Sequence, residues 1–361
     1  MGLKVIIPTA GKGTRLLPFT NSTPKVLLHV AGKPVLGHLF ESLLQCSKQN
    51  AKFKIEELII VHGHLGERVI QYVESTIGNR KSEIGIRRIS FVHQKEEIGL
   101  GHAIFLCKHL FKNEPVLILL GDTIFEVDYS RVVRETCVGV KTIEDPRRFG
   151  IVEIQNDFVT KIVEKPKEKK RSPVLIGLYY FEHSKPLFDV LDELVEYHQS
   201  KIGNLKSQIK EWWEGEIQFT DALQMLADRG ENIRPFEVEG WYDCGTPEAF
   251  LSTNHNLLEI GNRKSEIGNY STLRTPNSAF PNTEIIPPVS IHPDAKIEDS
   301  KIGPYVSVAK GATIRNAVLL DVIVNEGATI VGARSRHGGM PLHLKGKIVG
   351  ENETITADNR P

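Results

Sequence analysis

A glycine-rich loop follows the first apolar run of the chain. The run Leu3–Ile7 has the composition of a buried strand, and the loop continues through Gly11 and Gly13 to Leu16. Glycines after a strand allow the backbone to approach a phosphate closely and to point its N–H groups at it. Leu16 stands where the dinucleotide-binding pattern has its third glycine, and the Gly-Lys-Ser/Thr of a Walker A loop does not follow. The loop therefore predicts a phosphate site of another class.

The residues after this loop extend it into a longer motif. Arg15 is followed by Lys25 in a Thr-Pro-Lys triplet, and Leu27–Pro34 reads LLHVAGKP. The stretch Gly11–Pro34 resembles the N-terminal signature GxGTRLxPxTxxxPKxLLxVxGKP of the sugar-1-phosphate nucleotidylyltransferases, also called sugar-nucleotide pyrophosphorylases. Those enzymes join a nucleoside triphosphate to a sugar-1-phosphate and release pyrophosphate. The resemblance covers residues 1–258 and implies the same reaction here.

Further segments of this family follow in the family's order. They are HQ, GLGHA, LGD, RFGIV, VEKP, IGLY, GEIQFTDA and WYDCGTP, which begin at His93, Gly99, Leu120, Arg148, Val163, Ile176, Gly215 and Trp241. In the resembled enzymes the glutamine reads the base edge with the glycine beside it, which implies nucleotide binding by Gln94 and Gly99. The resemblance also implies a sugar-phosphate site, with Lys165 on the phosphate and Glu164 on the hydroxyls. The other residues implied at that site are Gly150, Tyr179 and Gln218.

The chemistry of this reaction explains the residue types. The phosphate of the sugar is already charged at neutral pH, because its second pKa is about 6, so a general base is not required. The difficulty is electrostatic, since an anion must approach the α-phosphorus of a polyanion, and cationic groups must neutralise the oxygens during an in-line transfer. We expect Arg15 and Lys25 to bind the triphosphate, next to the loop residues Gly11, Gly13 and Thr14.

Two aspartates are the expected metal ligands. Asp122 ends an apolar run, where a doubly wound sheet opens its ligand crevice, and Asp243 precedes a Gly-Thr-Pro helix start. Mg²⁺ usually takes one or two carboxylates together with substrate phosphates. The expected partners are therefore a nucleoside triphosphate and a sugar-1-phosphate, with Mg²⁺ as the cofactor.

The substrate pair is indicated by two of the family segments. IGLY and GEIQFTDA resemble the glucose-1-phosphate enzymes that use dTTP or UTP. Val26 stands where short thymidylyltransferases commonly carry glutamine, and Gln218 stands where they carry glutamate, which resembles uridylyltransferases. We expect glucose-1-phosphate with dTTP or UTP. The alternative is mannose-1-phosphate with GTP.

A hypothesis of another class is a non-catalytic regulatory subunit. Such proteins keep the fold but lose the phosphate and metal residues. Here those residues are all present, namely Arg15, Lys25, Asp122, Lys165 and Asp243. The sequence therefore favours the enzyme.

The elements that must position these residues follow an alternating pattern. Strands alternate with helices in the first part of the chain, which predicts a Rossmann-like α/β fold with a mixed, mainly parallel sheet flanked by helices. The expected strands are residues 3–7, 58–61, 89–92, 116–120, 136–142, 150–154, 159–163 and 176–181. The expected helices are residues 34–47, 67–77, 101–111, 185–197, 219–229 and 247–258, the last with Thr246 as its N-cap.

The C-terminal part has a different period. An apolar residue first and a small residue fifth recur in hexads such as Ile291/Ala295/Ile297, which is typical of a β-solenoid. We therefore expect a catalytic domain at 1–258, a linker at 259–284 and a short left-handed β-helix at 285–335. The tail at 336–361 carries no pattern that predicts its structure.

Composition limits the remaining possibilities. Forty-five basic residues balance forty-five acidic ones, which gives no argument for a nucleic-acid or membrane partner. The four cysteines form no CxxC pair, and the expected location is cytoplasmic. We also expect a homo-oligomer. The octapeptide GNRKSEIG occurs at both Gly78–Gly85 and Gly261–Gly268, and we have no physical account of it.

Overall fold

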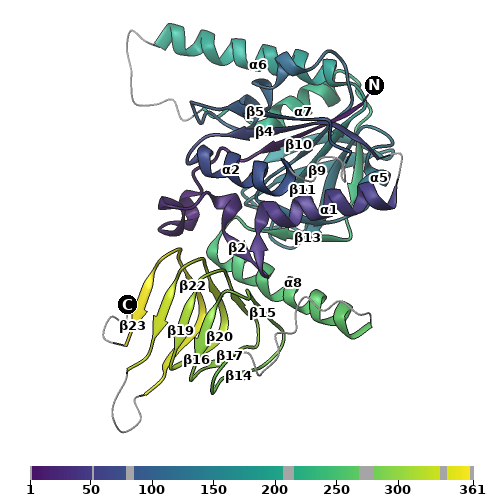
Figure 1. Cartoon of the computed structure of the whole chain (residues 1–361). Helices are drawn as coiled ribbons and strands as arrows, with labels where there is room; N and C mark the ends of the chain where they lie inside the picture. The colour runs from purple at the N-terminus through teal and green to yellow at the C-terminus, as the bar shows by residue number, and fades with distance from the viewer. Residues whose placement is uncertain are drawn as a thin grey trace. The chain divides into compact units, whose positions relative to one another are not determined.

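The chain forms two compact units in the computed structural model. The described residues are 2–50, 53–78, 85–205, 215–267, 280–333 and 340–357. The first unit consists of Met1–Lys12 and Leu39–Trp241, and the second of Gly13–His38 and Tyr242–Pro361. The first is built on a twisted mixed sheet with helices around it, and the second on stacked parallel strands and a long helix (Figure 1). The segment Gly13–His38 thus belongs with the C-terminal residues.

The parallel half of the sheet confirms the α/β prediction. Its strands lie in the order β5, β4, β1, β6. Their bounds are β1 Leu3–Pro8, β4 Ile55–His62, β5 Arg88–His93 and β6 Val116–Leu119. The apolar runs of β1 and β6 are buried, as expected for strands covered on both faces. The chain adds β4 and β5 on one side of β1 and then β6 on the other, which makes the β1/β6 boundary a topological switch point.

The other half of the sheet is mainly antiparallel. Strand β11 pairs antiparallel with β6, β8 and β9, while β10 pairs antiparallel with β9 and β12 pairs parallel with β8. Bounds are β8 Cys137–Ile143, β9 Gly150–Gln155, β10 Phe158–Glu164, β11 Ser172–Phe181 and β12 Arg234–Glu237. The short strand β7 is Thr123–Glu126 and β13 is Gly240–Asp243. This half extends the sheet past the switch point.

Helices cover the sheet, with α2 against β4 and α7 against β10 (Figure 1), and with α4 against β1. Bounds are α1 Val35–Gln49, α2 Gly66–Ile77, α4 Leu100–Phe105, α5 Tyr129–Val132, α6 Ser184–Leu205 and α7 Phe219–Asp228. The prediction that this helix reaches Phe111 is wrong, because α4 ends at Phe105. After Phe105 the backbone tightens, because Cys107 donates to Ile104 O and Leu110 to Cys107 O, and a 3₁₀ turn replaces the last α-turns.

The C-terminal strands stack in parallel, one turn of the chain above another. In one column Ile297, Ile314, Ile330 and Ile355 lie in register, and they belong to a shared apolar interior. The strands are β14 Glu284–Ile285, β15 Val289–Ile291, β16 Lys296–Glu298, β17 Lys301–Ile302, β18 Val306–Val308, β19 Thr313–Arg315, β20 Ala317–Val324, β21 Thr329–Val331, β22 Leu342–Val349 and β23 Thr354–Thr356. The tail, for which the sequence predicted nothing, supplies β22 and β23.

Helix α8 (Pro247–Ile267) is longer than expected. Thr246 caps it as predicted, since Thr246 Oγ1 accepts from Ala249 N at 3.3 Å. The helix continues past the expected end at Leu258 and includes most of the second GNRKSEIG segment. Most of the first copy, Gly78–Gly85, lies outside the described residues. In the part of the chain that the structure describes, no helix combines the length and apolarity needed to cross a membrane.

Candidate active site

The glycine-rich loop leaves β1 at the switch point, beside the turn that follows β6. Thr9 donates from both its N–H and its hydroxyl to Val61 O, at 2.7 and 2.8 Å. Gly121 donates to Pro8 O at 3.2 Å. The start of the loop and the Leu-Gly-Asp turn are therefore fastened to each other at the carboxyl edge of the sheet, where α/β proteins bind ligands. Gly11 lies in this loop and is exposed.

Asp122 acts electrostatically on Tyr179, one of the residues expected at the sugar site. It is half-buried and accepts a 3.3 Å hydrogen bond from Thr123 Oγ1. Burial, and then the negative charges of Glu164 and Asp122, raise the pKa of Tyr179. Tyr179 is buried on β11 and meets Phe219 edge-on, with ring centroids 4.9 Å apart. The first unit thus gathers Asp122, Glu164 and Tyr179 in one region.

The β9–β10 ladder brings Gly150 and Lys165 beside Glu164. Glu164 pairs with Gly150, and Lys165 donates from its N–H to Phe149 O at 3.1 Å. Lys165 Nζ lies 3.7 Å from Glu164 Oε1, and its side chain is 51% exposed. An exposed pair of this kind adds little stability. The ammonium can therefore exchange the carboxylate for a phosphate at small cost.

The expected base-reading residues form a second group in the same unit. Gln94 is buried, and its Nε2 donates to Gly99 O at 3.1 Å. Gly99 has φ 106°, and a Cβ there would lie 2.6 Å from Ile217 O. Ile217 also bonds to this loop, donating to Ile98 O at 2.7 Å. The segment that carries Gln218 is therefore joined to the loop that carries Gln94 and Gly99.

The triphosphate residues from Gly13 onward belong to the second unit. Thr14–Leu16 is a 3₁₀ turn in which Thr14 and Arg15 are exposed. Thr20 Oγ1 donates to Gly13 O at 2.9 Å, and a Cβ on Gly13 would lie 3.0 Å from Lys25 Cβ. Gly13, Thr14, Arg15 and Lys25 are thus close neighbours within one segment.

Asp243 is held at the start of α8. Its Oδ1 accepts from Gly245 N at 2.9 Å, and its carbonyl accepts from Thr253 Oγ1 at 2.8 Å. In the described residues no three His, Cys, Asp or Glu side chains gather as a metal cluster. Mg²⁺ does not need one, because it prefers oxygen ligands and uses one or two carboxylates plus phosphates. Asp122 in the first unit and Asp243 in the second each have a half-buried carboxylate of this kind.

Two further residues emerge only from the structure. Thr220 Oγ1 and Trp241 Nε1 are buried without a hydrogen-bond partner among the described residues. Thr220 lies against Gly150, and Trp241 meets Phe149 edge-on with ring centroids 5.1 Å apart. A buried donor without a partner is costly unless a ligand supplies one. Both lie in family segments, GEIQFTDA and WYDCGTP, but the sequence alone did not single them out.

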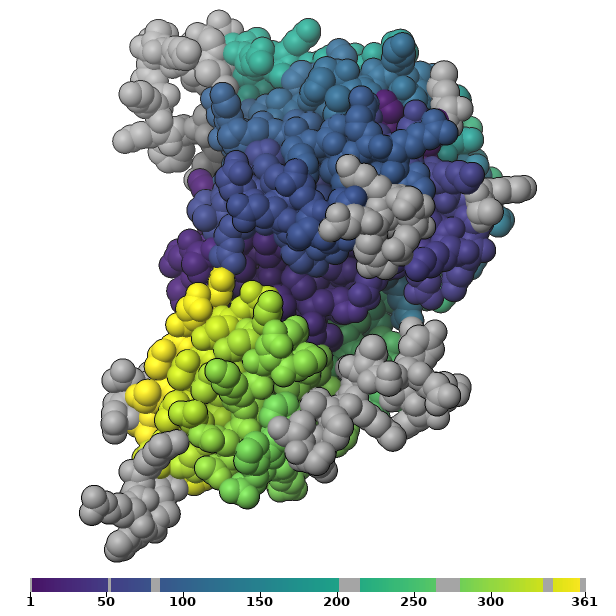
Figure 2. Space-filling view, viewed as in Figure 1, coloured from purple at the N-terminus to yellow at the C-terminus, as the bar shows by residue number. Residues whose placement is uncertain are grey.

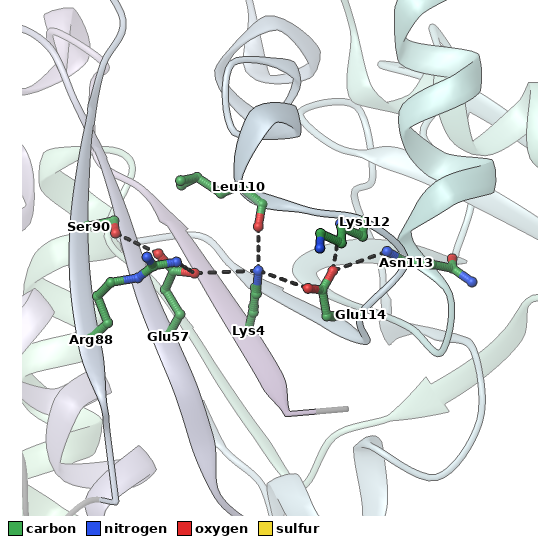
Figure 3. A network of polar contacts seen from close by, with 8 residues as sticks. All are labelled: Lys4, Glu57, Arg88, Ser90, Leu110, Lys112, Asn113 and Glu114. Atoms are coloured by element: carbon green, nitrogen blue, oxygen red, sulfur yellow. Dashed lines mark hydrogen bonds and ion pairs between the residues drawn. The ribbon is translucent and has the colours of Figure 1, made fainter.

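A different polar cluster lies at the amino edge of the same sheet (Figure 3). The buried Lys4 ammonium donates to Leu110 O and lies 3.5 Å from Glu57 and 3.3 Å from Glu114. Glu57 also accepts from Arg88 at 2.7 Å and from Ser90 at 2.6 Å. A cavity opens beside these residues, but their charges already neutralise one another and leave none for a ligand. We call these residues the amino-edge network and assign it a role in stabilising the fold.

Comparison with known proteins identifies the family of this chain. The family model described as nucleotidyl transferase matches residues 4–260. The chain belongs to this family. A bifunctional protein GlmU from Methanococcus maripaludis is 31% identical over 71% of this chain and 54% of its own length. The chain thus spans about half the length of such relatives.

Another relative matches the chain almost from end to end. A glucose-1-phosphate thymidylyltransferase from Streptomyces griseus is 24% identical over 98% of this chain and 94% of its own. Among solved structures, UDP-glucose pyrophosphorylase complexed with UDP-glucose superposes with a TM-score of 0.54 at 24% identity, over 72% of this chain and 100% of the other. The superposition shows a shared fold for the nucleotidyl transferase region.

Proposed function

We propose that this protein transfers a nucleotidyl group from a nucleoside triphosphate to a sugar-1-phosphate and releases pyrophosphate. The observation that carries the proposal is that Asp122, which follows the turn tied to the start of the Gly-rich loop, and Glu164 both act electrostatically on the buried Tyr179. A carboxylate for a cation, a carboxylate for hydroxyls and a phosphate loop are the parts that this reaction needs. Membership of the nucleotidyl transferase family supports the same reaction.

In this proposal the phosphates are handled by cationic groups and a metal. Arg15 and Lys25 bind the triphosphate and stabilise the departing pyrophosphate, with Gly11, Gly13 and Thr14 supplying backbone N–H groups. Asp122 and Asp243 hold Mg²⁺, which when bound neutralises phosphate oxygens. No side chain acts as a general base, because the sugar phosphate is already an anion.

The organic parts of the substrates are recognised by the two groups in the first unit. Gln94 and Gly99 contact the base. Glu164 accepts from sugar hydroxyls, and Lys165 binds the phosphate of the sugar. The remaining contacts to the sugar come from Gly150, Tyr179 and Gln218, and the buried donors of Thr220 and Trp241 supply hydrogen bonds to its hydroxyls.

We propose glucose-1-phosphate with dTTP or UTP as the substrate pair. The near full-length match to a protein named glucose-1-phosphate thymidylyltransferase supports this choice. Mannose-1-phosphate with GTP is the alternative. We further propose that the C-terminal parallel strands form a short left-handed β-helix and that the protein is a cytoplasmic homo-oligomer.

The test is pyrophosphate release from a matrix of dTTP, UTP, GTP, ATP and CTP against glucose-, mannose-, galactose- and N-acetylglucosamine-1-phosphate, with Mg²⁺ or with EDTA. We expect the largest signal for glucose-1-phosphate with dTTP or UTP, and none with EDTA. A best signal for mannose-1-phosphate with GTP would retain the reaction and replace the substrate pair. If folded protein released no pyrophosphate in any combination, the enzyme would be rejected and the regulatory subunit favoured.

A further inference from the structure

The signature segment contains a tight hairpin whose turn is tied to another part of the second unit. Strands β2 (His29–Val30) and β3 (Lys33–Pro34) pair antiparallel. Between them Ala31 and Gly32 have φ values of 46° and 90°, the positive values of a two-residue hairpin turn. The Ala31 N–H donates to Asn254 Oδ1 on α8 at 2.9 Å. The turn therefore depends on a side chain more than two hundred residues away in sequence.

Asn254 connects this turn to the C-terminal strands. Its side chain is fully buried. Its Nδ2 donates to Tyr305 O at 3.1 Å, and its Oδ1 accepts from Ser307 Oγ at 2.5 Å as well as from Ala31. A buried carboxamide with all these partners holds its neighbours in one arrangement, because any shift leaves a buried polar group without a partner.

Other contacts join the segment to successive turns of the strand stack. His29 donates from its backbone N–H to Asn325 Oδ1 at 3.2 Å, and its ring Nε2 lies 3.3 Å from Glu326 Oε1. Thr23 Oγ1 donates to Glu351. In Figure 2 the C-terminal strands to which the segment is attached are the green to yellow atoms. The segment is thus attached at Thr23, at His29 and at Ala31.

The attached segment is the one that carries the triphosphate residues. Lys25 lies between the attachments at Thr23 and Ala31, and its Cβ packs beside Gly13. We propose that Asn254 is a positioning residue for triphosphate binding, and that α8 and the C-terminal strands hold the signature segment in its binding shape. The inference rests on the proposed role of Lys25 and Arg15 at the triphosphate.

The test compares four variants in the full-length protein. Asn254→Ala removes the central link, and Asn256→Ala is its control, because Asn256 is an exposed residue of the same helix. Glu351→Ala removes the link to Thr23, whereas Glu351→Gln keeps an oxygen that can accept from its hydroxyl. Each variant is measured for KM and kcat with both substrates, and for amide hydrogen exchange in residues 23–34 without substrates.

We expect Asn254→Ala to raise the KM for the triphosphate about tenfold and Glu351→Ala about threefold, with the KM for the sugar phosphate changed less than about twofold. Amide exchange in residues 23–34 should quicken in both. Asn256→Ala and Glu351→Gln should behave like the parent protein in both measurements. Glu351→Ala keeps the proposal testable if Asn254→Ala fails to fold.

The two measurements separate the inference from the proposed function. Unchanged exchange in residues 23–34 would overturn the inference whatever the activity. Faster exchange with an unchanged triphosphate KM would also overturn it, provided that Lys25→Ala still abolishes turnover. If Lys25→Ala left turnover normal, the triphosphate role itself would be wrong, while faster exchange would still show that Asn254 holds the segment.

Discussion

The polar groups at the two edges of the central sheet differ in whether they have partners within the protein. At the amino edge Lys4 is buried between Glu57 and Glu114, and every one of these groups meets an opposite charge or a hydrogen-bond partner (Figure 3). At the carboxyl edge Asp122 and Glu164 both raise the pKa of Tyr179, and the buried donors of Thr220 and Trp241 have no hydrogen-bond partner among the described residues. A buried network that is satisfied internally stabilises one fold, whereas groups left for a ligand cost stability until it binds.

The largest effect should follow from removing the carboxylate at the carboxyl edge. We expect Asp122→Ala to lower turnover by about a hundredfold or more, because Mg²⁺ loses a protein ligand and the phosphate charges are then less well neutralised. The unfolding free energy should stay the same or rise slightly. Steady-state kinetics with a thermal melt would show this. The control is Asp189→Asn, which changes a half-exposed aspartate on α6. Turnover of Asp122→Ala within about twofold of the parent would refute the role of Asp122.

The reverse pattern should follow at the amino edge. Lys4→Met keeps the length of the side chain but leaves Glu57 and Leu110 O without their buried cation, and we expect a loss of about 3 kcal/mol in unfolding free energy. Turnover of the folded protein should not change. The control is Lys161→Met, which removes an exposed pair with Glu153 and should cost less than about 1 kcal/mol. Equal losses in urea denaturation would contradict the comparison.

Acid should weaken the amino edge in a way that depends on Lys4. Burial alone would raise the pKa of Glu114, but hydrogen bonds from the N–H groups of Lys112 and of Glu114 itself, and from Lys4, lower it to about 2. A carboxyl with a depressed pKa contributes stability above its unfolded value, here 4.5, and loses that contribution as the pH falls toward 2. We expect on the order of 2 kcal/mol to disappear across that window.

Urea denaturation between pH 7 and pH 3 would measure this loss. In Lys4→Met the pH dependence should be shallower, because one group that lowers the pKa of Glu114 is gone. An identical slope in the parent and the variant would show that Lys4 does not act on Glu114. Burial also opposes the charged form of Glu57, but its hydrogen bonds from Arg88 and Ser90 lower the pKa of that carboxyl in the folded protein.

The smallest effect should come from the residue that orients Asp122. Thr123→Val keeps the shape of a buried side chain and removes a 3.3 Å hydrogen bond to the carboxylate. Because the bond is long, we expect the Mg²⁺ concentration for half-maximal rate to rise only about threefold. A magnesium titration of the rate checks this, and a change of a hundredfold would mean that Thr123 itself contacts the metal or the substrate.

Much of the fold could be predicted because its strands are fully apolar or strictly periodic. The run Val116–Leu119 predicted β6, and the hexads predicted positions such as Ile297, Ile314 and Ile330, which lie in register. The tail strand β22 was not predicted, because the hexad spacing is interrupted before it. The end of α8 was not predicted either, because residues 259–267 are largely polar.

The role of individual polar residues was harder to predict. Asn254 occurs in a helix, where a polar side chain normally indicates solvent, and only the long-range partners Ala31 and Ser307 explain its burial. Thr220 and Trp241 belong to segments that the sequence singled out, but only the structure shows that their buried donors lack a partner among the residues it describes. The roles of Arg15 and Lys25 stay predictions that rest on the family signature.

The grouping of Gly13–His38 with the C-terminal residues affects how such proteins can be recombined. A chimera that took only residues 242–357 from a relative would bring together a hairpin turn and an α8 helix that were never matched. The Ala31 N–H or the Asn254 carboxamide would then be buried without a partner. The interchangeable part is therefore discontinuous in sequence: residues 13–38 have to be transplanted together with residues 242–357.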